Sequence, residues 1–443
     1  MKFKISTLFF ILFFCVYSNA QKIMVESFGA KGDGKTDDSK ALNALFRSKY
    51  RDCFLTKNKV YRVKNKLFLN SNKVIHGNNA TLICDESLDT LFYGCNKKNI
   101  VLRDLTILGT SKENKKQIAF WLKNVNSFSL ENSKLSGDKF NSGFSLGVFC
   151  YSECDNMSLV NNLFNNIKGT VSGSGYAIHT KDSKKVKIFN NTFRANKGDS
   201  RHAIYLSAGT QNAHVKGNNI YNYECGAISL YSYYYQKPTQ NNLLEQNYIY
   251  GGTNKFEFDG SITIFQNCNN NIIKNNTIIK SGAYGIVLSG DTVHIPMSKC
   301  LNNQIIGNKI DSCTNAGIAT WGAHFTKIRE NEISNTNWNR KDLTLCALGV
   351  YDDCNYKGNN EGTEVIDNIL IKNPNCKYAI RVWANTKDNF KEKGNEIELN
   401  MKNQYFTSNI NPLSIKGFLS TNKLPVFLFC LVLCTGVIWK MIR

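Results

Sequence analysis

An asparagine recurs at nearly constant spacing through the middle of this sequence. The residues are Asn162, Asn191, Asn219, Asn247 and Asn276, which follow one another at steps of 29, 28, 28 and 29 residues. Each lies beside a short patch in which apolar and polar residues alternate. A period of this length predicts a solenoid, because each repeat buries its apolar face only against the neighbouring repeats.

A second motif repeats in step with the asparagines. Its copies are Tyr176-Ala177-Ile178-His179, His202-Ala203-Ile204-Tyr205, Gly226-Ala227-Ile228-Ser229, Tyr284-Gly285-Ile286-Val287, Ala316-Gly317-Ile318-Ala319, Leu348-Gly349-Val350-Tyr351 and Tyr378-Ala379-Ile380-Arg381. Alternation with a period of two indicates strands, and no apolar run with helical spacing occurs between Thr81 and Leu399. The pattern predicts a parallel β-helix. Asparagine suits its corners because it tolerates left-handed backbone and its amides pair between coils, so we interpret the asparagine rows as structural ladders.

Composition agrees with one elongated domain. The 443 residues are 42% hydrophobic, enough for a continuous core, and a solenoid of this length remains a single unit. The formal net charge is +21, but no run of five or more lysines occurs, which argues against a nucleic-acid-binding tail. The charge favours an acidic polymer or an anionic cell surface as the partner, with simple solubility as the alternative.

Both ends of the chain carry targeting features. Residues 1–20 combine an early positive charge, an apolar run and a small-residue end, which predicts a cleaved signal peptide. A polar linker at 401–423 precedes an apolar segment at 424–443 that ends in basic residues. We expect a secreted protein that stays at the cell surface through a C-terminal membrane anchor. A processed sorting or lipid-anchor signal is the alternative for that segment.

The fifteen cysteines do not form a disulfide pattern. Cys154, Cys268 and Cys300 each stand two or three residues before a ladder asparagine, so they share a register and are expected to stack as small buried side chains. The spacing between coils permits an occasional bridge without implying a framework. No CxxC pair occurs, so we expect no metal site and no cofactor; calcium is possible but is not indicated by a motif.

The most specific local motif lies near the N-terminus, at Phe28-Gly29-Ala30-Lys31-Gly32-Asp33-Gly34-Lys35-Thr36-Asp37-Asp38. The following apolar stripe, Ala41, Leu42, Leu45 and Phe46, predicts a short helix that covers the open end of the solenoid. Together with Val60-Tyr61-Arg62-Val63 and Val74-Ile75-His76-Gly77, the segment resembles the entry of the pectate-lyase-like right-handed β-helix superfamily. This resemblance, over residues 24 to about 400, implies an all-β fold: a single-stranded right-handed parallel β-helix of about ten coils at 65–400, entered through a cap at 21–64.

The superfamily includes polygalacturonases, polysaccharide lyases, uronan epimerases and phage tailspike depolymerases, so the resemblance does not fix a reaction. Polygalacturonases carry Asp-Asp, Gly-His-Gly and Arg-x-Lys in successive coils. Here Asp352-Asp353 is present, no Gly-His-Gly follows it, and Arg381-Val382-Trp383 does not complete the set. The Asp-Pro-His-Glu cluster of mannuronan epimerases and the Arg-x-Pro-x-x-Arg of classical pectate lyases are also absent, so we assign no specific family.

Candidate catalytic residues follow from the register of the repeated strand. If Ile178 and its equivalents point inward, the residues after them point out, which places His179, Lys181, Arg201 and Tyr205 on adjacent coils. A β-eliminating lyase needs cations to neutralise a uronate, a base for its α-proton and an acid for the leaving oxygen. These four residues are our candidate catalytic set. The alternative is that His179 and Tyr205 are ordinary surface residues.

A second cluster is predicted on the same face. Its members, the candidate substrate-binding residues, are Tyr231, Trp321, Tyr351, Asp353, Arg381 and Trp383. Aromatic side chains can stack on sugars, and Asp353 can serve as an acid or pair with Arg381. A glycosidase needs two carboxyl groups about 5 to 9.5 Å apart. Asp259 and Asp353 lie three coils, or roughly 14 Å, apart, so a lyase is favoured over a hydrolase.

Two classes of function remain open from the sequence. In the first, this is an exported, surface-anchored enzyme that cleaves an acidic polysaccharide by β-elimination or hydrolysis. In the second, it is a non-catalytic glycan-binding or structural module at the cell surface, because repeated coils and asparagine ladders need no active site.

Overall fold

The computed structural model describes residues 22–406 except for 112–115, 138–142, 170–172, 197–199, 234, 253–258, 291–299, 339–344, 352–360, 384–389 and 399–400. The expected signal peptide at 1–20 and the expected anchor at 424–443 lie outside this range, so both stay predictions. Within the range, no helix is long and apolar enough to cross a membrane.

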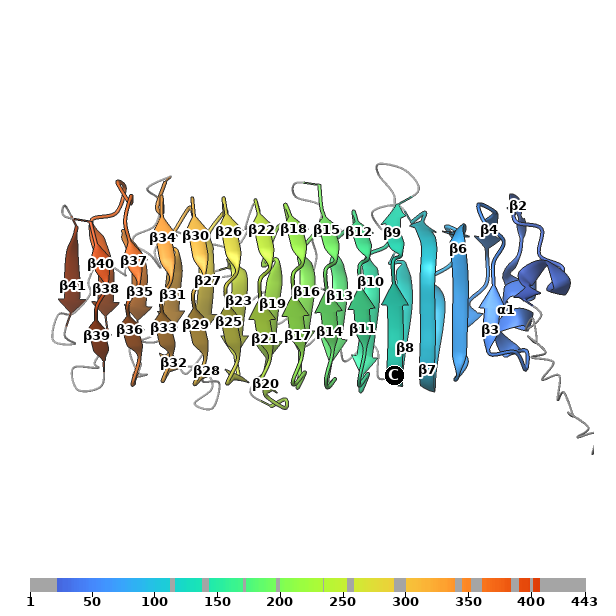
Figure 1. Cartoon of the computed structure of the whole chain (residues 1–443), viewed down its shortest axis with the longest axis horizontal. Coiled ribbons are helices and arrows are strands. Elements are labelled where there is room, and N and C mark those ends of the chain that lie inside the picture. The colour runs from blue at the N-terminus through green and yellow to red at the C-terminus, as the bar shows by residue number, and fades with distance from the viewer. Residues whose placement is uncertain are drawn as a thin grey trace, which may run out of the picture.

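The described chain is a parallel β-solenoid of about 12 turns (Figure 1). The all-β prediction is confirmed. Turns already form in the segment predicted as the entry, because β3 (Asp52–Phe54) and β4 (Val60–Val63) both pair with β6 (Lys73–Cys84). At the other end β41 (Lys402–Phe406) pairs with β38 (Tyr378–Trp383), so the coils continue past residue 400. The extra turns lie at these two ends.

Three ladders of parallel strands run along the solenoid. The first sheet carries the repeated strand motif: β8 (Ile118–Glu131), β10 (Leu146–Ser152), β13 (Tyr176–Lys181), β16 (His202–Ser207), β19 (Ile228–Ser232), β23 (Gly260–Gln266), β27 (Tyr284–Ser289), β31 (Ile318–Trp321), β35 (Cys346–Tyr351), β38 and β41. The second sheet contains β3, β6, β7 (Thr90–Gly109), β8, β11 (Ser158–Val160), β14 (Lys187–Phe189), β17 (His214–Lys216), β21 (Leu243–Glu245), β25 (Ile272–Lys274), β29 (Gln304–Ile306), β33 (Lys327–Arg329), β36 (Glu364–Ile366) and β39 (Lys391–Lys393).

The third sheet contains β2 (Asp33–Asp37), β4, β6, β7, β9 (Lys134–Gly137), β12 (Leu163–Asn165), β15 (Thr192–Arg194), β18 (Asn219–Tyr221), β22 (Tyr248–Tyr250), β26 (Thr277–Ile279), β30 (Lys309–Asp311), β34 (Glu332–Ser334), β37 (Ile369–Leu370) and β40 (Glu396–Ile397). The remaining strands are short: β1 (Ile23–Met24), β5 (Leu67–Phe68), and the pairs β20 (Thr239–Gln240) with β24 (Cys268–Asn269) and β28 (Cys300–Leu301) with β32 (Ala323–His324). Strands β6 and β8 are long enough to take part in two sheets, and β7 takes part in all three, with β5 beside it in the first.

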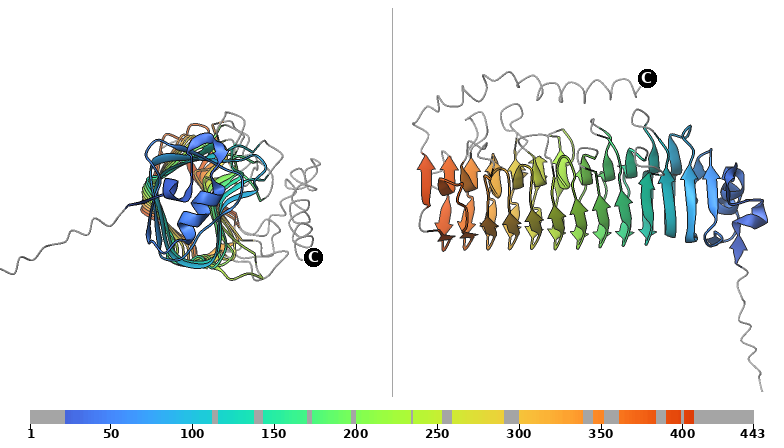
Figure 2. Two further views of the ribbon diagram at one scale, coloured as in Figure 1. Left: turned by 90° about the vertical axis from the view of Figure 1, so that its right-hand side faces the viewer. Right: turned by 90° about the horizontal axis from the view of Figure 1, so that it is seen from above.

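The capping helix is confirmed as α1 (Ser39–Arg47), which lies across the N-terminal end of the coils (Figure 2, left view). A short 3-10 helix, η1 (Val25–Phe28), packs beside it. The predicted stripe is buried, with Leu42, Leu45 and Phe46 fully inaccessible. The Asp37 carboxylate accepts a hydrogen bond from the Ser39 amide, 3.0 Å away, at the start of the helix. The helix therefore closes the core with its apolar face and anchors its first turn through Asp37.

The core is a stack of branched apolar side chains. The predicted inward row, Ile178, Ile204, Ile228, Ile286, Ile318 and Ile380, is fully buried and in register from coil to coil. Where the residue before the isoleucine is an alanine, as at Ala177 and Ala203, it is also part of the core. Two consecutive residues therefore point inward, so the residues on either side of the pair, such as Tyr176 and His179, both point outward.

One coil departs from the predicted register. In β35 the partner of Ile318 is Leu348, and Gly349 lies opposite Ala319. The sequence there contains two small-then-branched pairs, Ala347-Leu348 and Gly349-Val350, and the structure uses the first as the corner. Our prediction that Tyr351 occupies the row of His179 is wrong by two residues. Tyr351 lies opposite Trp321 instead.

A ladder of asparagine amides runs along the solenoid at the corner that leads into the third sheet. Each amide donates to the side-chain oxygen of the next rung, in the order Asn162, Asn191, Asn218, Asn247, Asn276, Asn308, Asn331, Asn368 and Asn395. The predicted ladder is confirmed, with one correction: its third rung is Asn218 rather than Asn219. In that coil Gly217 takes the left-handed corner, at φ 64°, which elsewhere is taken by residues such as Asn190.

This correction provides a matched pair of variants. Asn218→Ala should lower the free energy of unfolding by about 3 kcal/mol, because the buried Asn191 amide and the Ile188 carbonyl would lose their partner. Asn219→Ala, at an exposed position of the next residue, should change it by less than about 0.5 kcal/mol. Urea denaturation of both variants measures the difference. Equal losses would contradict the assignment of the rung.

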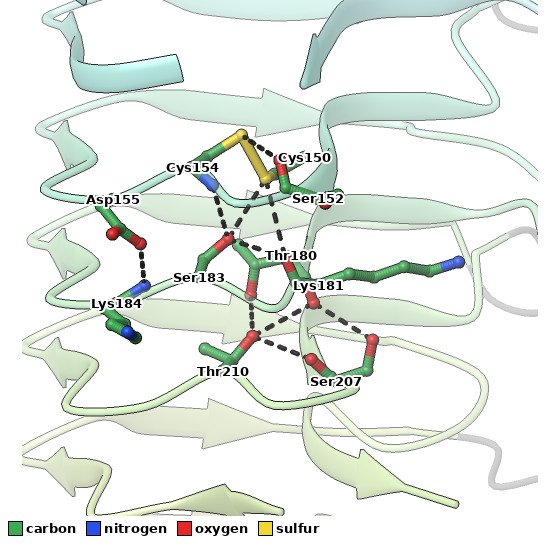
Figure 3. The surroundings of a disulfide bond; sticks show 10 residues. All are labelled: Cys150, Ser152, Cys154, Asp155, Thr180, Lys181, Ser183, Lys184, Ser207 and Thr210. Atoms are coloured by element: carbon green, nitrogen blue, oxygen red, sulfur yellow. Dashed lines mark hydrogen bonds between the residues drawn. A yellow bond between two sulfur atoms is a disulfide. The ribbon is translucent and has the colours of Figure 1, made fainter. Parts of the chain in front are cut away.

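One disulfide occurs among the described cysteines, between Cys150 and Cys154 (Figure 3). Its Cys154 member was expected to be a small buried thiol, which is corrected here. Below the bridge, the same inner row continues with Ser183, whose hydroxyl lies 3.2 Å from Cys150 Sγ, and with Thr210. Cys268 and Cys300 are buried free thiols on consecutive coils, as the register predicted. The bridge lies within one coil, at a sequence separation of 4, whereas the spacing argument allowed a bridge between neighbouring coils.

Candidate functional site

Three of the predicted catalytic residues meet on the outer face of the first sheet. His179 on β13 and Tyr205 on β16 are direct partners in the ladder, and their rings lie 4.9 Å apart in an edge-on arrangement. Arg201 stands just before β16, with its guanidinium 5.9 Å from the ring centroid of Tyr176 and close enough to act electrostatically on Tyr205. The sequence-based cluster is therefore a spatial one.

Two further members of this cluster were missed by the sequence reasoning. Tyr176 stacks on Tyr205 at 5.1 Å, and His202 lies 5.2 Å from Tyr176 and 5.0 Å from Tyr205. Both precede an inward pair, Ala177-Ile178 or Ala203-Ile204. A strictly alternating reading places them inside, whereas the double inward step places them beside His179 and Tyr205.

His179 is buried and neutral. Burial lowers its pKa well below the usual value, and the nearby Lys181 charge lowers it further. Its Nε2 lies 3.0 Å from the Ser207 hydroxyl, and that hydroxyl donates to the Thr180 carbonyl at 3.1 Å. Ser207 has one hydroxyl proton; with that proton on the Thr180 carbonyl, Nε2 donates to the Ser207 oxygen and the lone pair resides on Nδ1. This tautomer makes Nδ1 the proton acceptor.

Tyr205 and Arg201 have complementary protonation states. Burial raises the pKa of the Tyr205 phenol well above its usual value, so the phenol carries its proton at neutral pH. The pKa of Arg201 is raised, although burial alone would lower it, because of tyrosine and cysteine groups around it, so the guanidinium stays charged. Burial lowers the pKa of His202 to about 3, and its Nδ1 donates to the Gly226 carbonyl at 2.9 Å. The cluster thus holds a neutral imidazole, a protonated phenol and a fixed cation.

A row of polar residues flanks the cluster at the positions that immediately precede the repeated strands. Arg201, Cys225 and Asp259 occupy these positions in three consecutive turns, and the Cys225 amide donates to the Arg201 carbonyl at 3.0 Å. Burial raises the pKa of the Asp259 carboxyl to about 6, an effect that the Arg201 charge opposes. The buried Glu224 lies next to Cys225. The sequence reasoning considered Asp259 only with Asp353; its place directly before a strand motif was the available signal.

Lys181, the fourth predicted catalytic residue, points elsewhere. Its ammonium lies 5.7 Å from the Phe149 ring centroid and 5.6 Å from that of Tyr151, both on the preceding coil. Lys181 influences His179 through its charge, but its cation is held over these two rings.

The second predicted cluster does not assemble as a substrate site within the described residues. Trp321 stacks on Tyr351 at 4.3 Å, and Tyr351 is only 2% exposed with its hydroxyl 3.1 Å from Cys346 Sγ. The Tyr351 side chain is therefore packed against the protein, and its predicted role in substrate binding stays a prediction. Arg381 lies 5.6 Å from the Tyr378 ring. Asp353 and the side chain of Trp383 lie outside the described part of the chain.

Tyr231, the remaining predicted substrate contact, sits in a stack. Its ring lies 6.2 Å from Tyr205 and 5.4 Å from Phe265, nearly parallel to both. Tyr233 also meets this ring in a T-shaped contact at 4.7 Å, so protein rings surround Tyr231 and hinder sugar stacking on it. Among the residues that the structure describes, no three His, Cys, Asp or Glu side chains gather in a way that could hold a metal ion.

Comparison with known proteins supports the fold. The family model for a right handed beta helix region matches residues 176–355. No curated protein sequence matches the chain. Similar solved structures include the catalytic unit of a thermostable alpha-1,3-glucanase from Streptomyces thermodiastaticus, at TM-score 0.59 and 11% identity, covering 85% of this chain and 69% of that one.

Two other similar structures have different roles. A surface adhesin of Streptococcus pneumoniae has a TM-score of 0.51 and 14% identity, with 87% of this chain and 92% of that chain covered. The A-module of a mannuronan C-5 epimerase from Azotobacter vinelandii has a TM-score of 0.50 and 14% identity, with 88% and 97% covered. At these identities the likeness establishes fold alone. The chain thus has a right-handed parallel β-helix fold, its residues 176–355 match the family model for that fold, and no narrower family is assigned.

Proposed function

We propose that this protein cleaves an acidic polysaccharide by β-elimination at the cluster of His179, Arg201 and Tyr205. The observation that carries the proposal is their convergence: an imidazole and a phenol 4.9 Å apart beside a guanidinium. Arg201 would neutralise the uronate carboxylate and so acidify the neighbouring proton. His179 Nδ1 would take that proton, and the Tyr205 phenol would give its own to the leaving oxygen.

The step balances without a further reactant. The C–H bond next to the carboxylate breaks, its electrons form a carbon–carbon double bond, and the glycosidic C–O bond breaks with protonation of the leaving oxygen. The products are an unsaturated uronate and a new chain end with a free hydroxyl. The neutral state of His179 and the protonated state of Tyr205 fit the start of this step. The net charge of +21 supports an anionic substrate.

The proposal is tested by incubating the full-length protein with a panel of uronic-acid polymers. Two signals are followed: the ultraviolet absorbance of an unsaturated uronate and the number of reducing ends. A rise in both supports elimination. Reducing ends without absorbance would indicate hydrolysis, for which Glu224 and Asp259 would be the carboxyl groups to test first. If no uronan in the panel gives either signal, the proposal is overturned.

Replacing Arg201 with alanine should weaken both binding and turnover. Arg201 would contact the carboxylate in the bound substrate and in the transition state, so its loss should raise KM and lower kcat, each by about tenfold or more. Arg201→Lys should recover part of the loss, because it keeps the charge but not the two-pronged geometry. Steady-state kinetics of both variants measure this. An unchanged KM in Arg201→Ala would exclude the carboxylate-binding role.

The affinity for an acidic polymer should fall as pH rises through the pKa of Asp259. That carboxyl is neutral below about 6 and becomes an anion above it, where it competes with the polymer for Arg201. The two histidines have lowered pKa values and stay neutral across this window. Calorimetric titrations one unit below and one unit above pH 6 measure the change. Asp259→Asn should remove most of it; a pH dependence that persists in that variant would assign it to another group.

A non-catalytic glycan-binding module is the second candidate. The observation that favours it is the continuous stacking on the first sheet, which stabilises the coils and needs no substrate. The similar adhesin structure shows that the same fold can occur in a surface protein described by binding. In either case we propose that the protein is exported and held at the cell surface, as the two ends of its sequence predict. Fractionation of cells that express the full chain tests this location.

A further inference from the structure

A stacked aromatic row begins several coils before the candidate catalytic cluster. Tyr93 and Trp121 lie parallel at 4.8 Å, and Trp121 stacks on Tyr151 at 5.7 Å. Tyr151, at the end of β10, is 46% exposed and is among the most exposed large side chains of the described chain. Trp121 covers one side of its ring. Phe149 meets the ring edge-on at 6.1 Å, and nearly half of the Tyr151 side chain is accessible to solvent.

Two lysines approach Tyr151 from the neighbouring coils on either side. β10 lies between β8 and β13 in the ladder. Lys123 of β8 places its ammonium 5.8 Å from the Tyr151 ring centroid, and Lys181 of β13 places its ammonium 5.6 Å from the same point. The charges of Lys116 and Lys181 also act on each other. Two ammonium groups from two strands therefore lie at this ring, and a third positive charge, that of Lys116, acts on one of them.

No protein carboxylate balances this charge within the described residues. Lys116, Lys123 and Lys181 form no ion pair there, whereas lysines elsewhere do, as Lys237 does with Asp182 at 2.7 Å. Like charges held together repel one another, and a bound anion would relieve that repulsion. The Cys150–Cys154 disulfide (Figure 3) closes the short segment that contains Tyr151.

We propose that Tyr151, Lys123 and Lys181 form an anion-binding subsite for the same polysaccharide, N-terminal to the cleavage position along the solenoid. The subsite deepens the proposed function and rests on it for the identity of the polymer. Lys181 lies one coil, or about 4.8 Å, from the turn of Tyr205, and Lys123 lies two coils further on. The polymer therefore runs along the axis of the β-helix. It carries a carboxylate or sulfate on a sugar outside the cleaved linkage.

Binding rather than turnover tests the subsite. The probes are an oligogalacturonate, a dextran sulfate and a neutral dextran of similar length, titrated calorimetrically into full-length protein that carries Tyr205→Phe. Lys123→Met and Lys181→Met keep the apolar stem of each side chain and remove its charge. Lys187→Met, at an exposed position of β14 on the second sheet, is the matched control. Melting curves check that all variants are folded.

Each subsite variant should weaken oligogalacturonate binding about tenfold, the amount expected for one lost charge-assisted hydrogen bond, with no change in Lys187→Met. An equal loss of affinity for dextran sulfate means that the subsite binds carboxylate and sulfate groups alike. A loss for oligogalacturonate alone identifies the carboxylate. Unchanged affinity for both anionic probes, or an equal loss for neutral dextran, overturns the subsite. If these variants lose binding but the wild type cleaves no uronan, the subsite is supported and the proposed lyase activity is contradicted.

Discussion

Ile228→Asp is expected to abolish folding of the β-helix. Ile228 is fully buried, with Ile204 and Ile262 as its partners in the coils on either side. A carboxylate at this position would be an unpaired charge in an apolar core, and each coil of a solenoid depends on its neighbours for burial. The loss of free energy should therefore exceed the stability of the fold. Soluble yield, circular dichroism and thermal melting report the result.

Ile228→Val is the matched control for this prediction. It removes one methyl group from the same position and should cost about 1 kcal/mol while the protein still folds. A soluble Ile228→Asp variant that melts cooperatively would contradict the inward assignment. The inward side chain of this strand would then belong to a residue next to Ile228, because a shift of one residue exchanges the two faces of a strand.

The sequence predicted the architecture because the fold is repetitive. Ile178, Ile204, Ile228 and their equivalents recur with one period, so each coil repeats the same pattern of an inward branched residue. A misassigned register in one copy therefore does not hide the pattern in the others. The capping helix was predictable for a different reason, since Leu42, Leu45 and Phe46 define an apolar stripe that needs a surface to cover.

The sequence predicted the register of individual coils less reliably than the overall architecture. Asn218 and Asn219 are adjacent, and only the left-handed backbone of Gly217 decides that the first of them enters the ladder. Ala347-Leu348 and Gly349-Val350 likewise compete for one corner. In each case two neighbouring positions, or pairs of positions, have similar sequence patterns, so the pattern alone does not choose between them.

The candidate site was predicted in part. His179 and Tyr205 could be placed together because their distance follows from the strand register alone. Tyr176 and His202 could not, because their direction depends on the double inward step at the corner. The direction of Lys181 toward Tyr151 depends on a long flexible side chain, which no spacing rule determines.

Tyr205→Phe is expected to remove most turnover and to leave substrate binding nearly intact. The substitution keeps the ring that stacks on Tyr176 and contacts His179, so packing and stability should change little. It removes only the hydroxyl, whose proton is held at neutral pH because burial raises its pKa. Loss of a proton-transfer group lowers kcat by about 100-fold to 10,000-fold, with KM nearly unchanged.

Steady-state kinetics on the uronan cleaved by the wild type measure this effect, with Tyr248→Phe on the third sheet as the matched control. The control should retain full activity, because Tyr248 belongs to a different sheet from the cluster. A large rise in KM without loss of kcat would reassign Tyr205 to substrate binding. Full activity in both Tyr205→Phe and Arg201→Ala would exclude this cluster as the reaction centre. The surface near Trp321 and Arg381 would then become the next place to search, because the remaining outward aromatic and cationic side chains of the predicted set lie there.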